Sequence, residues 1–267
     1  MRIHYMSDVH LEFGALDKPL PKGDVVVLAG DITLLAALDP SKTDARARRL
    51  REVTLDFFDT VQRSFGTVVY LMGNHEHYGF CIDESADAIR HHLPGVTLLE
   101  NAHIALGNDT LLCGATLWTD MGGGDPQMEQ MVQRAMSDFY VIEKRDGDGL
   151  RSFRPSDARA LFAASLSYIK ELADANRDKQ LVVATHHAPS KLGTASSQRT
   201  SRVNPAYFTD LTAFIEDRPN IGVWIHGHTH VQTEYAIGRC RVLSNARGYT
   251  GREPAAARFD PDRWFEI

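Results

Sequence analysis

Polar clusters that directly follow apolar, strand-like runs are the feature that most constrains how this chain can fold. The clusters are Asp8-Val9-His10, Gly30-Asp31, Gly73-Asn74-His75-Glu76, His186-His187 and Gly227-His228-Thr229-His230. Their side chains can act together only if the ends of distant strands meet at one edge of a sheet. Because every cluster is needed, this favours one domain over residues 1–267, although 267 residues would allow about two.

Apolar runs alternate with stretches of helical periodicity along most of the chain, which predicts an α/β fold. The apolar runs are continuous, as is typical of strands covered on both faces. Predicted strands cover residues 3–6, 24–29, 67–72, 181–185 and 221–225, and predicted helices cover 42–63, 83–92, 156–173 and 207–216. The five clusters therefore come at the ends of five predicted strands.

Three regions depart from this alternation. Short strands are predicted at 96–99, 103–106 and 110–117, and the turn signals between them favour antiparallel hairpins. From 119 to 154 the pattern is lost, which predicts an inserted loop and helix segment that either covers the site or decorates the surface. Residues 233–242 alternate like a single edge or half-exposed strand.

Composition narrows the class of protein. No apolar run reaches the ~18 residues of a membrane span, and the first residues lack the features of a secretory signal. Cys81, Cys113 and Cys240 are odd in number and widely separated, so neither a disulfide framework nor a thiolate metal site is indicated. We therefore expect a cytoplasmic protein without a membrane partner. The sequence leaves the oligomeric state open.

The net charge of −6 argues against extended binding of nucleic acid, because such binding depends on Lys and Arg. The local exception is a group of four arginines in the predicted helix over 42–63. These side chains form either a solvated helix face or a patch for an anionic partner. They are Arg46, Arg48, Arg49 and Arg51.

Histidines gather at the predicted strand ends, where eight of the twelve lie in or beside the clusters. Imidazole and carboxylate ligands together suit Mn, Fe, Zn or Co, whereas Mg or Ca would favour oxygen ligands alone. Asp8 and His10, like His228 and His230, are two residues apart and are expected to point to the same side of an extended backbone. Asp31 can bridge two ions, since a carboxylate has two oxygens. The sequence therefore predicts a site for two metal ions at the strand ends.

In this order, the motifs D-x-H, G-D, G-N-H-E, H-H-x-P and G-H-x-H resemble those of the calcineurin-like metallophosphoesterases, from Asp8 to His230. The resemblance implies a four-layer α/β-β/α sandwich with two mixed sheets and flanking helices. It also implies two divalent or trivalent ions, for which Mn, Fe or Zn is expected. One ion would be held by Asp8, His10, Asp31 and His230, and the other by Asp31, Asn74, His186 and His228.

The resemblance further implies a hydrolase in which a metal-bridging hydroxide attacks a phosphoester bond. Asp31 would serve this reaction as the bridging ligand. His75 resembles the family's catalytic histidine, which protonates the leaving oxygen or stabilises phosphoryl charge, although a purely orienting role is the alternative. Glu76 is expected to orient the backbone or a ligand. His77 and His226 are expected to support the ligands or belong to the core.

A small phosphomonoester or phosphodiester is the favoured substrate, because the chain is compact and acidic. Candidate substrate contacts are His187, Arg199, Arg202 and Arg247, with Lys191 and Tyr249 nearby. One alternative is a nuclease or nucleotide pyrophosphatase of the same superfamily. A nuclease should show a continuous track of basic residues that leads into the site. A lesser alternative is a non-catalytic, metal-dependent binding module, which should lack a ligand or His75.

Overall fold

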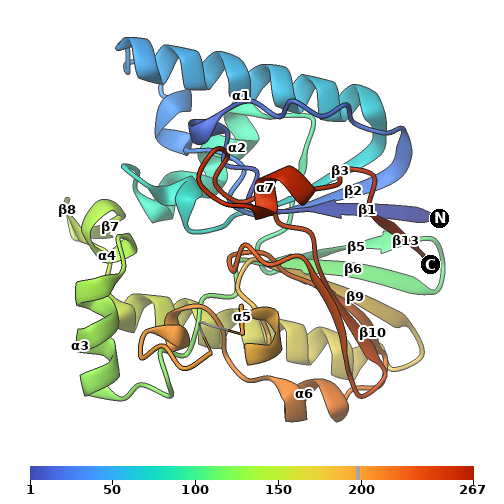
Figure 1. Cartoon of the computed structure of the whole chain (residues 1–267). Coiled ribbons are helices and arrows are strands. Elements are labelled where there is room, and N and C mark those ends of the chain that lie inside the picture. Colours follow the sequence, from blue (N-terminus) through green and yellow to red (C-terminus); the bar gives the residue numbers. More distant parts are fainter. Residues whose placement is uncertain (197–198) are drawn as a thin grey trace.

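The computed structural model describes residues 1–196 and 199–267, and two mixed sheets form its centre (Figure 1). The first sheet has the order β13-β1-β2-β3-β4. Strands β1 to β4 are parallel, and β13 pairs antiparallel with β1. The bounds are Arg2–Met6 for β1, Gly23–Ala29 for β2, Phe65–Leu71 for β3, Thr97–Leu98 for β4 and Trp264–Glu266 for β13.

The second sheet has the order β11-β12-β10-β9-β6-β5. Its four central strands are parallel, and β5 and β11 pair antiparallel at the two edges. The bounds are Ala102–Leu106 for β5, Thr110–Ala115 for β6, Gln180–Thr185 for β9, Ile221–Ile225 for β10, Thr233–Ile237 for β11 and Cys240–Ser244 for β12.

The helices cover the outer faces, which completes the four layers (Figure 1). Helices α1 (Ala45–Ser64) and α2 (Ser85–His92) lie on the first sheet, and α5 (Pro155–Ala175) and α6 (Thr212–Glu216) lie on the second. Asp44 caps α1 by accepting hydrogen bonds from the amides of Arg46 and Ala47 at 3.1 and 3.0 Å. Between the sheets, a core of Val, Ile and Leu side chains leaves both sheets covered on both faces, as the continuous apolar runs predict.

Three predicted elements differ in the structure. Residues 96–99 form no hairpin, because β4 pairs parallel with β3 in the first sheet, while β5 and β6 form the only one of the expected hairpins. The single strand expected over 233–242 is a hairpin of β11 and β12, since Gly238 turns the chain at a φ of 56°. Of the helix expected over 207–216, only α6 is α-helical.

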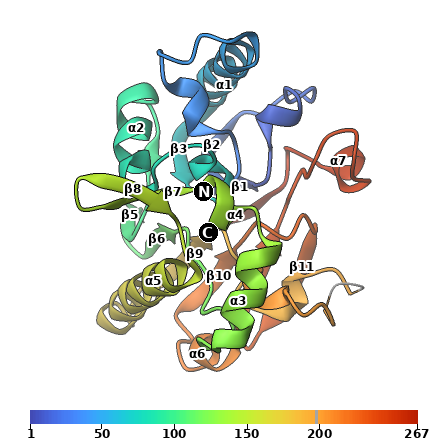
Figure 2. The same cartoon turned by 90° about the vertical axis from the view of Figure 1, so that its left-hand side faces the viewer.

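The segment 119–154 is more ordered than the sequence indicates. It contains α3 (Pro126–Ala135), α4 (Asp138–Val141) and an antiparallel hairpin of β7 (Glu143–Asp146) and β8 (Gly149–Ser152). Buried side chains, among them Val132 and Phe153, join it to the core beneath the second sheet. Figures 1 and 2 show it at the end of the molecule toward which the parallel strands point.

Two further facts bear on the class of protein. Within residues 1–196 and 199–267, no helix is both long and apolar enough to cross a membrane. All three cysteines are buried and free.

Candidate metal centre

The loops that follow five parallel strands bring all seven predicted metal ligands to one end of the molecule. The chain leaves β1 beside β2, where the amide of Asp8 donates to the carbonyl of Gly30 at 3.0 Å. On the second sheet, the amide of Gly227 after β10 donates to the carbonyl of His186 after β9 at 2.9 Å. These contacts fix the clusters of neighbouring strands side by side. The ligands fall into two groups that share Asp31.

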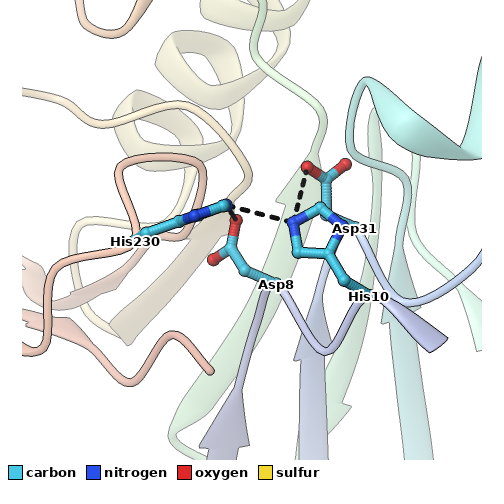
Figure 3. Close-up of side chains that lie close together, drawn as sticks. All are labelled: Asp8, His10, Asp31 and His230. Carbon is cyan, nitrogen blue, oxygen red and sulfur yellow. Dashed lines mark hydrogen bonds and ion pairs between the residues drawn. The ribbon is translucent and has the colours of Figure 1, made fainter. Parts of the chain in front are cut away.

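The first group contains Asp8, His10, Asp31 and His230, whose donor atoms lie within 4.8 Å of one another (Figure 3). The Nε2 atoms of His10 and His230 are 3.0 Å apart. His230 Nε2 lies 3.5 Å from Asp8 Oδ1, and His10 Nε2 lies 3.7 Å from Asp31 Oδ2. These are the four residues that the resemblance assigns to one ion.

The second group contains Asp31, His186 and His228, and Asn74 completes it. Asn74 Oδ1 lies 3.1 Å from His186 Nε2 and 3.0 Å from His228 Nδ1. His186 Nε2 lies 3.4 Å from Asp31 Oδ2. Asp31 Oδ1 accepts the amide hydrogen of His75 at 2.8 Å, so Oδ2 is the oxygen that faces both groups.

Contacts behind the imidazoles direct three ring nitrogens into the site. Carboxylates accept from Nδ1 of His10 (Glu12, 2.9 Å) and of His230 (Glu253, 2.7 Å), and the Ala29 carbonyl accepts from Nδ1 of His186 at 2.9 Å. In the neutral imidazole, each Nε2 is therefore left with a lone pair that points at the other donor atoms. Such a set of nitrogen and oxygen donors, with the second nitrogen fixed by a hydrogen bond, fits a bound cation of the Mn, Fe or Zn type.

Without a cation, carboxylates govern the charge of His186. Burial lowers its pKa, but Asp31 and Asp8 outweigh burial and raise it to about 10. Because a metal binds the neutral imidazole, binding must displace this proton. Metal affinity should therefore fall as the pH is lowered.

The backbone delivers these ligands in a conformation that the sequence did not indicate. Asp8, His10, Asp31, His228 and His230 all lie in the left-handed region, with φ between 49° and 65°. The expectation that the paired ligands share one side of an extended strand is wrong, although the pairs do converge. Left-handed conformations cost roughly 1–2 kcal/mol per non-glycine residue and are typical of functional sites.

Glycines allow the loops to approach the ligands closely. A Cβ at Gly30 would lie 2.4 Å from Nδ1 of His186, and one at Gly73 would lie 2.2 Å from Oδ1 of Asp31. Gly30 also has a φ of 83°, which side chains rarely adopt. No larger residue fits at either position without moving a ligand.

Glu76 orients the backbone around Asp31, as expected. Its buried carboxylate accepts from the amides of Asp31 at 2.9 Å, Ile32 at 2.7 Å and Gly73 at 2.6 Å. The hydroxyl of Tyr70 donates to it at 2.7 Å. Glu76 therefore ties the loop after β2 to the loop after β3.

His75 lies at the edge of the site and faces a pocket. Its ring stacks on Tyr78 at 4.2 Å between centroids, and its Nδ1 lies 2.8 Å from Glu12 Oε1. Its Nε2 is 3.4 Å from the hydroxyl of Tyr249. Burial lowers the pKa of His75, but Asp31 and Glu12 raise it to about 9, so the imidazolium form is present at neutral pH.

The pocket in front of the two groups has a volume of about 250 Å³. Three tyrosines, Tyr78, Tyr207 and Tyr249, line it together with ligands of both groups. The segment 119–154 contributes Ala135, Met136 and Ser137 to its wall. The same segment supplies Asp138, which accepts from Asn74 Nδ2 at 2.7 Å and thereby turns Asn74 Oδ1 toward the second group.

Of the predicted substrate contacts, the structure brings none of the four to this pocket. Arg247 is buried and donates to the carbonyls of Val9, Gly14 and Ala15 at 2.7–2.9 Å, so it holds the loop after β1. His187 lies behind the site, where its ring stands 4.2 Å from that of His228 and burial lowers its pKa to about 3. Arg199 and Arg202 are exposed and absent from the described residues of the pocket wall.

His77 and His226 belong to the interior. His77 pairs with Ser85 at 2.7 Å, and burial lowers its pKa to about 3. Burial likewise lowers the pKa of His226 to about 4. Both therefore remain neutral and contribute no charge to the site.

Sequence reasoning missed Glu12, Asp138, Glu253 and the tyrosines Tyr78 and Tyr207. Glu12 alone carries a local signal, because it extends D-x-H by two residues. Asp138 and Glu253 reach the site from distant elements, and no spacing connects them to it. Tyr249 was expected at the cleft, and it lies there.

Comparisons with known proteins agree with this geometry. A family model described as calcineurin-like phosphoesterase matches residues 1–232. The solved structure of phosphopantetheinyl hydrolase from Mycobacterium tuberculosis aligns with 92% of this chain and 89% of its own, with a TM-score of 0.63 and 15% identity. A dimetal phosphatase from Danio rerio aligns with 95% and 89%, with a TM-score of 0.57 and 9% identity. A comparison with curated proteins finds no match.

Proposed function

Since the chain belongs to the calcineurin-like phosphoesterase family, we propose that it is a two-metal hydrolase that cleaves a small phosphomonoester or phosphodiester. The observation that carries the proposal is the pair of ligand groups that share Asp31 Oδ2. Asp8, His10, Asp31 and His230 would hold one ion, and Asp31, Asn74, His186 and His228 the other. When bound, the ions would activate the attacking water and neutralise charge on the phosphoryl group.

His75 is the residue of the chain best placed to act on the leaving group. It lines the pocket, lies outside both ligand sets and carries a proton at neutral pH. A positioned imidazolium can protonate the leaving oxygen as the ester bond breaks. Tyr249, 3.4 Å from Nε2, limits where that proton can point.

The charge of the pocket supports a small ester with a single phosphate. Among the described residues that line it, none is Lys or Arg, whereas Asp31 and Glu253 are acidic. A pyrophosphate or a nucleic-acid backbone carries further negative charges that such a wall cannot neutralise. The tyrosines and Met136 instead offer contact to an uncharged organic group.

The arginine-rich helix offers a nuclease little support. It lies on the outer face of the first sheet (Figure 1), and Arg51 donates to the carbonyls of Ala37 and Lys42 at 2.8 and 3.0 Å. Arg46 and Arg49 line a separate hollow beside Phe13. The binding-module alternative has no supporting observation, since every expected ligand position and His75 are filled.

Two further expectations remain part of the proposal. The segment 119–154 would act as a fixed cap that shapes the substrate pocket, because its residues 135–137 form part of the pocket wall. A cytoplasmic location is consistent with three free, buried cysteines.

The test is a substrate panel assayed after chelation and re-addition of Mn, Fe, Zn, Ni or Mg. The panel contains phosphomonoesters, phosphodiesters, nucleoside diphosphates and single-stranded DNA, and it includes a phosphopantetheinyl ester because of the structural neighbour. We expect metal-dependent cleavage of small single-phosphate esters to exceed that of diphosphates and DNA. Preferred cleavage of DNA or of a pyrophosphate bond would contradict the proposed substrate class.

A further inference from the structure

Glu12 occupies an unusual place between the metal groups and His75. It lies in the short 3₁₀ turn Leu11–Phe13 directly after the first ligand loop, and its side chain is 3% exposed. One carboxylate oxygen, Oε1, contacts both histidines: it lies 2.9 Å from His10 Nδ1 and 2.8 Å from His75 Nδ1. The rings of these two histidines meet edge to face, 4.4 Å apart.

This carboxylate has no structural duty apart from the two imidazoles. Within the described part of the chain, its other oxygen, Oε2, is buried without a hydrogen-bond partner. Burying a carboxylate is costly unless its interactions compensate. Packing alone therefore does not explain a buried carboxylate at position 12, because an apolar side chain would fill the space without this cost.

We infer that Glu12 is a positioning residue that sets the tautomer and ring orientation of His75 and His10 together. An ionised carboxylate only accepts hydrogen bonds, so both histidines must carry a hydrogen on Nδ1. The Nε2 of His10 is then left free to face the first metal group. The Nε2 of His75 becomes the one position at which that ring can exchange a proton with a substrate in the pocket.

The neighbours of His75 show why a hydrogen bond is needed to hold the ring. Tyr78 stacks on one face of His75 with an interplanar angle of 24°, which fixes the plane of the ring. Stacking alone leaves the ring free to flip about its Cβ–Cγ bond, which exchanges the positions of Nδ1 and Cδ2 and those of Nε2 and Cε1. The bond to Glu12 removes this freedom. In this way Glu12 connects the predicted ligand His10 to the proton donor His75, which lies 63 residues after Glu12 in the sequence.

The inference rests on the proposed function, and a double-mutant cycle tests it. Glu12→Met keeps the side-chain length but removes the acceptor, and Glu12→Gln keeps an acceptor oxygen. At saturating metal, we expect Glu12→Met to lower kcat by about 10- to 100-fold with little change in KM. Glu12→Gln should keep much of the activity that Glu12→Met loses. In a His75→Ala background, Glu12→Met should lower kcat by less than about twofold, because the two residues act as one unit.

Two results would overturn the inference. The first is that Glu12→Met lowers kcat equally in the wild type and in the His75→Ala background. The second is that excess metal fully restores the kcat of Glu12→Met, which would mean that Glu12 supports only His10. The exposed Glu52→Met is the matched control and should leave kcat unchanged.

A second measurement separates this inference from the proposed function. In the metal-free protein, at a pH above the His75 pKa of about 9 where that ring is neutral, imidazole ¹⁵N shifts should report the Nδ1–H form for His10 and His75, and Glu12→Met should mix the two tautomers. Absence of the Nδ1–H form in the wild type would refute the role of Glu12. Absence of any phosphoester cleavage would instead refute the proposed function and leave the tautomer result standing.

Discussion

The histidines near the site differ in what surrounds their rings, and they fall into three sets. His10, His186 and His230 have Nδ1 fixed from behind, so Nε2 faces the two groups of candidate ligands. His75 has the same bond behind it but faces the pocket. His77, His187 and His226 are buried and neutral, for which burial is the main cause. Position in a motif alone does not separate these roles.

Replacing His75 by Ala should separate metal binding from proton transfer. His75 lies outside both ligand groups, so the variant should retain both ions. We expect kcat to fall by about 10²- to 10⁴-fold, the usual contribution of a positioned acid. The loss should be greatest for esters with poor leaving groups, which need the proton most. Metal analysis together with kinetics on a leaving-group series checks this, and loss of an ion from the variant would show that His75 is a ligand.

A half-buried carboxyl outside the site, that of Glu100, should make stability depend on pH. Glu100 accepts from the amide and hydroxyl of Thr116 at 3.0 and 2.8 Å, and burial raises its pKa from 4.5 to about 7. As the pH rises from 4.5 to about 7, the unfolded chain loses this proton before the folded protein does, so the free energy of unfolding falls.

Replacing Glu100 by Gln removes this proton while keeping the acceptor oxygen. At about 1.4 kcal/mol per pH unit, the variant should gain at most about 3 kcal/mol over the wild type at pH 8, and clearly less at pH 5. Urea unfolding at the two pH values measures the difference. An equal difference at both would mean that Glu100 titrates normally in the folded protein.

At the scale of elements, α3 connects the inserted segment to the pocket. Val132 is fully buried against the core beneath the second sheet, and Ala135, Met136 and Ser137 just beyond it line the pocket. If the segment acts as a cap, the docking of α3 should control how well substrate binds.

The substitution Val132→Asp should undock α3, because it places an unpaired charge among apolar side chains. We expect KM to rise about tenfold or more and both ions to remain bound, with new proteolytic cleavage within 126–135. The control is Leu150→Asp, which also replaces an apolar residue by Asp but at a position 52% exposed in the same segment. An unchanged KM despite undocking would show that the segment does not shape the substrate pocket.

The sequence predicts elements well where one physical signal dominates. The continuous apolar runs predict β1, β2, β3, β9 and β10 to within two residues. Short runs rich in Val, Ile and Leu are typical of strands covered on both faces. β4, β11 and β12 were misassigned, since their pairing depends on tertiary neighbours rather than on their own residues. The strand β13 was missed, because it depends on pairing with β1 at the other end of the chain.

At the scale of the whole molecule, the convergence of the ligands follows from topology. Two sheets that pack face to face bring the carboxyl ends of parallel strands from both halves of the chain to the same end (Figure 1). This is why the backbone amide of His228 can donate a hydrogen bond to the carboxylate of Asp8, although the two residues lie 220 positions apart in the sequence. The candidate ligands and their order along the chain were predicted from the sequence, and the structure brings them together. Their left-handed backbone, and the supporting Glu12, Asp138 and Glu253, required the fold.

The number of metal ions bound per chain tests the central claim most directly. After reconstitution and removal of free metal, elemental analysis should find two ions in the wild type and in the control Asp178→Asn, an exposed site. Asp31→Asn should bind one ion or none and should lose turnover, because Asp31 Oδ2 faces both groups. A wild type that binds no more than one ion, or an Asp31→Asn variant that keeps two ions and full activity, would contradict the account.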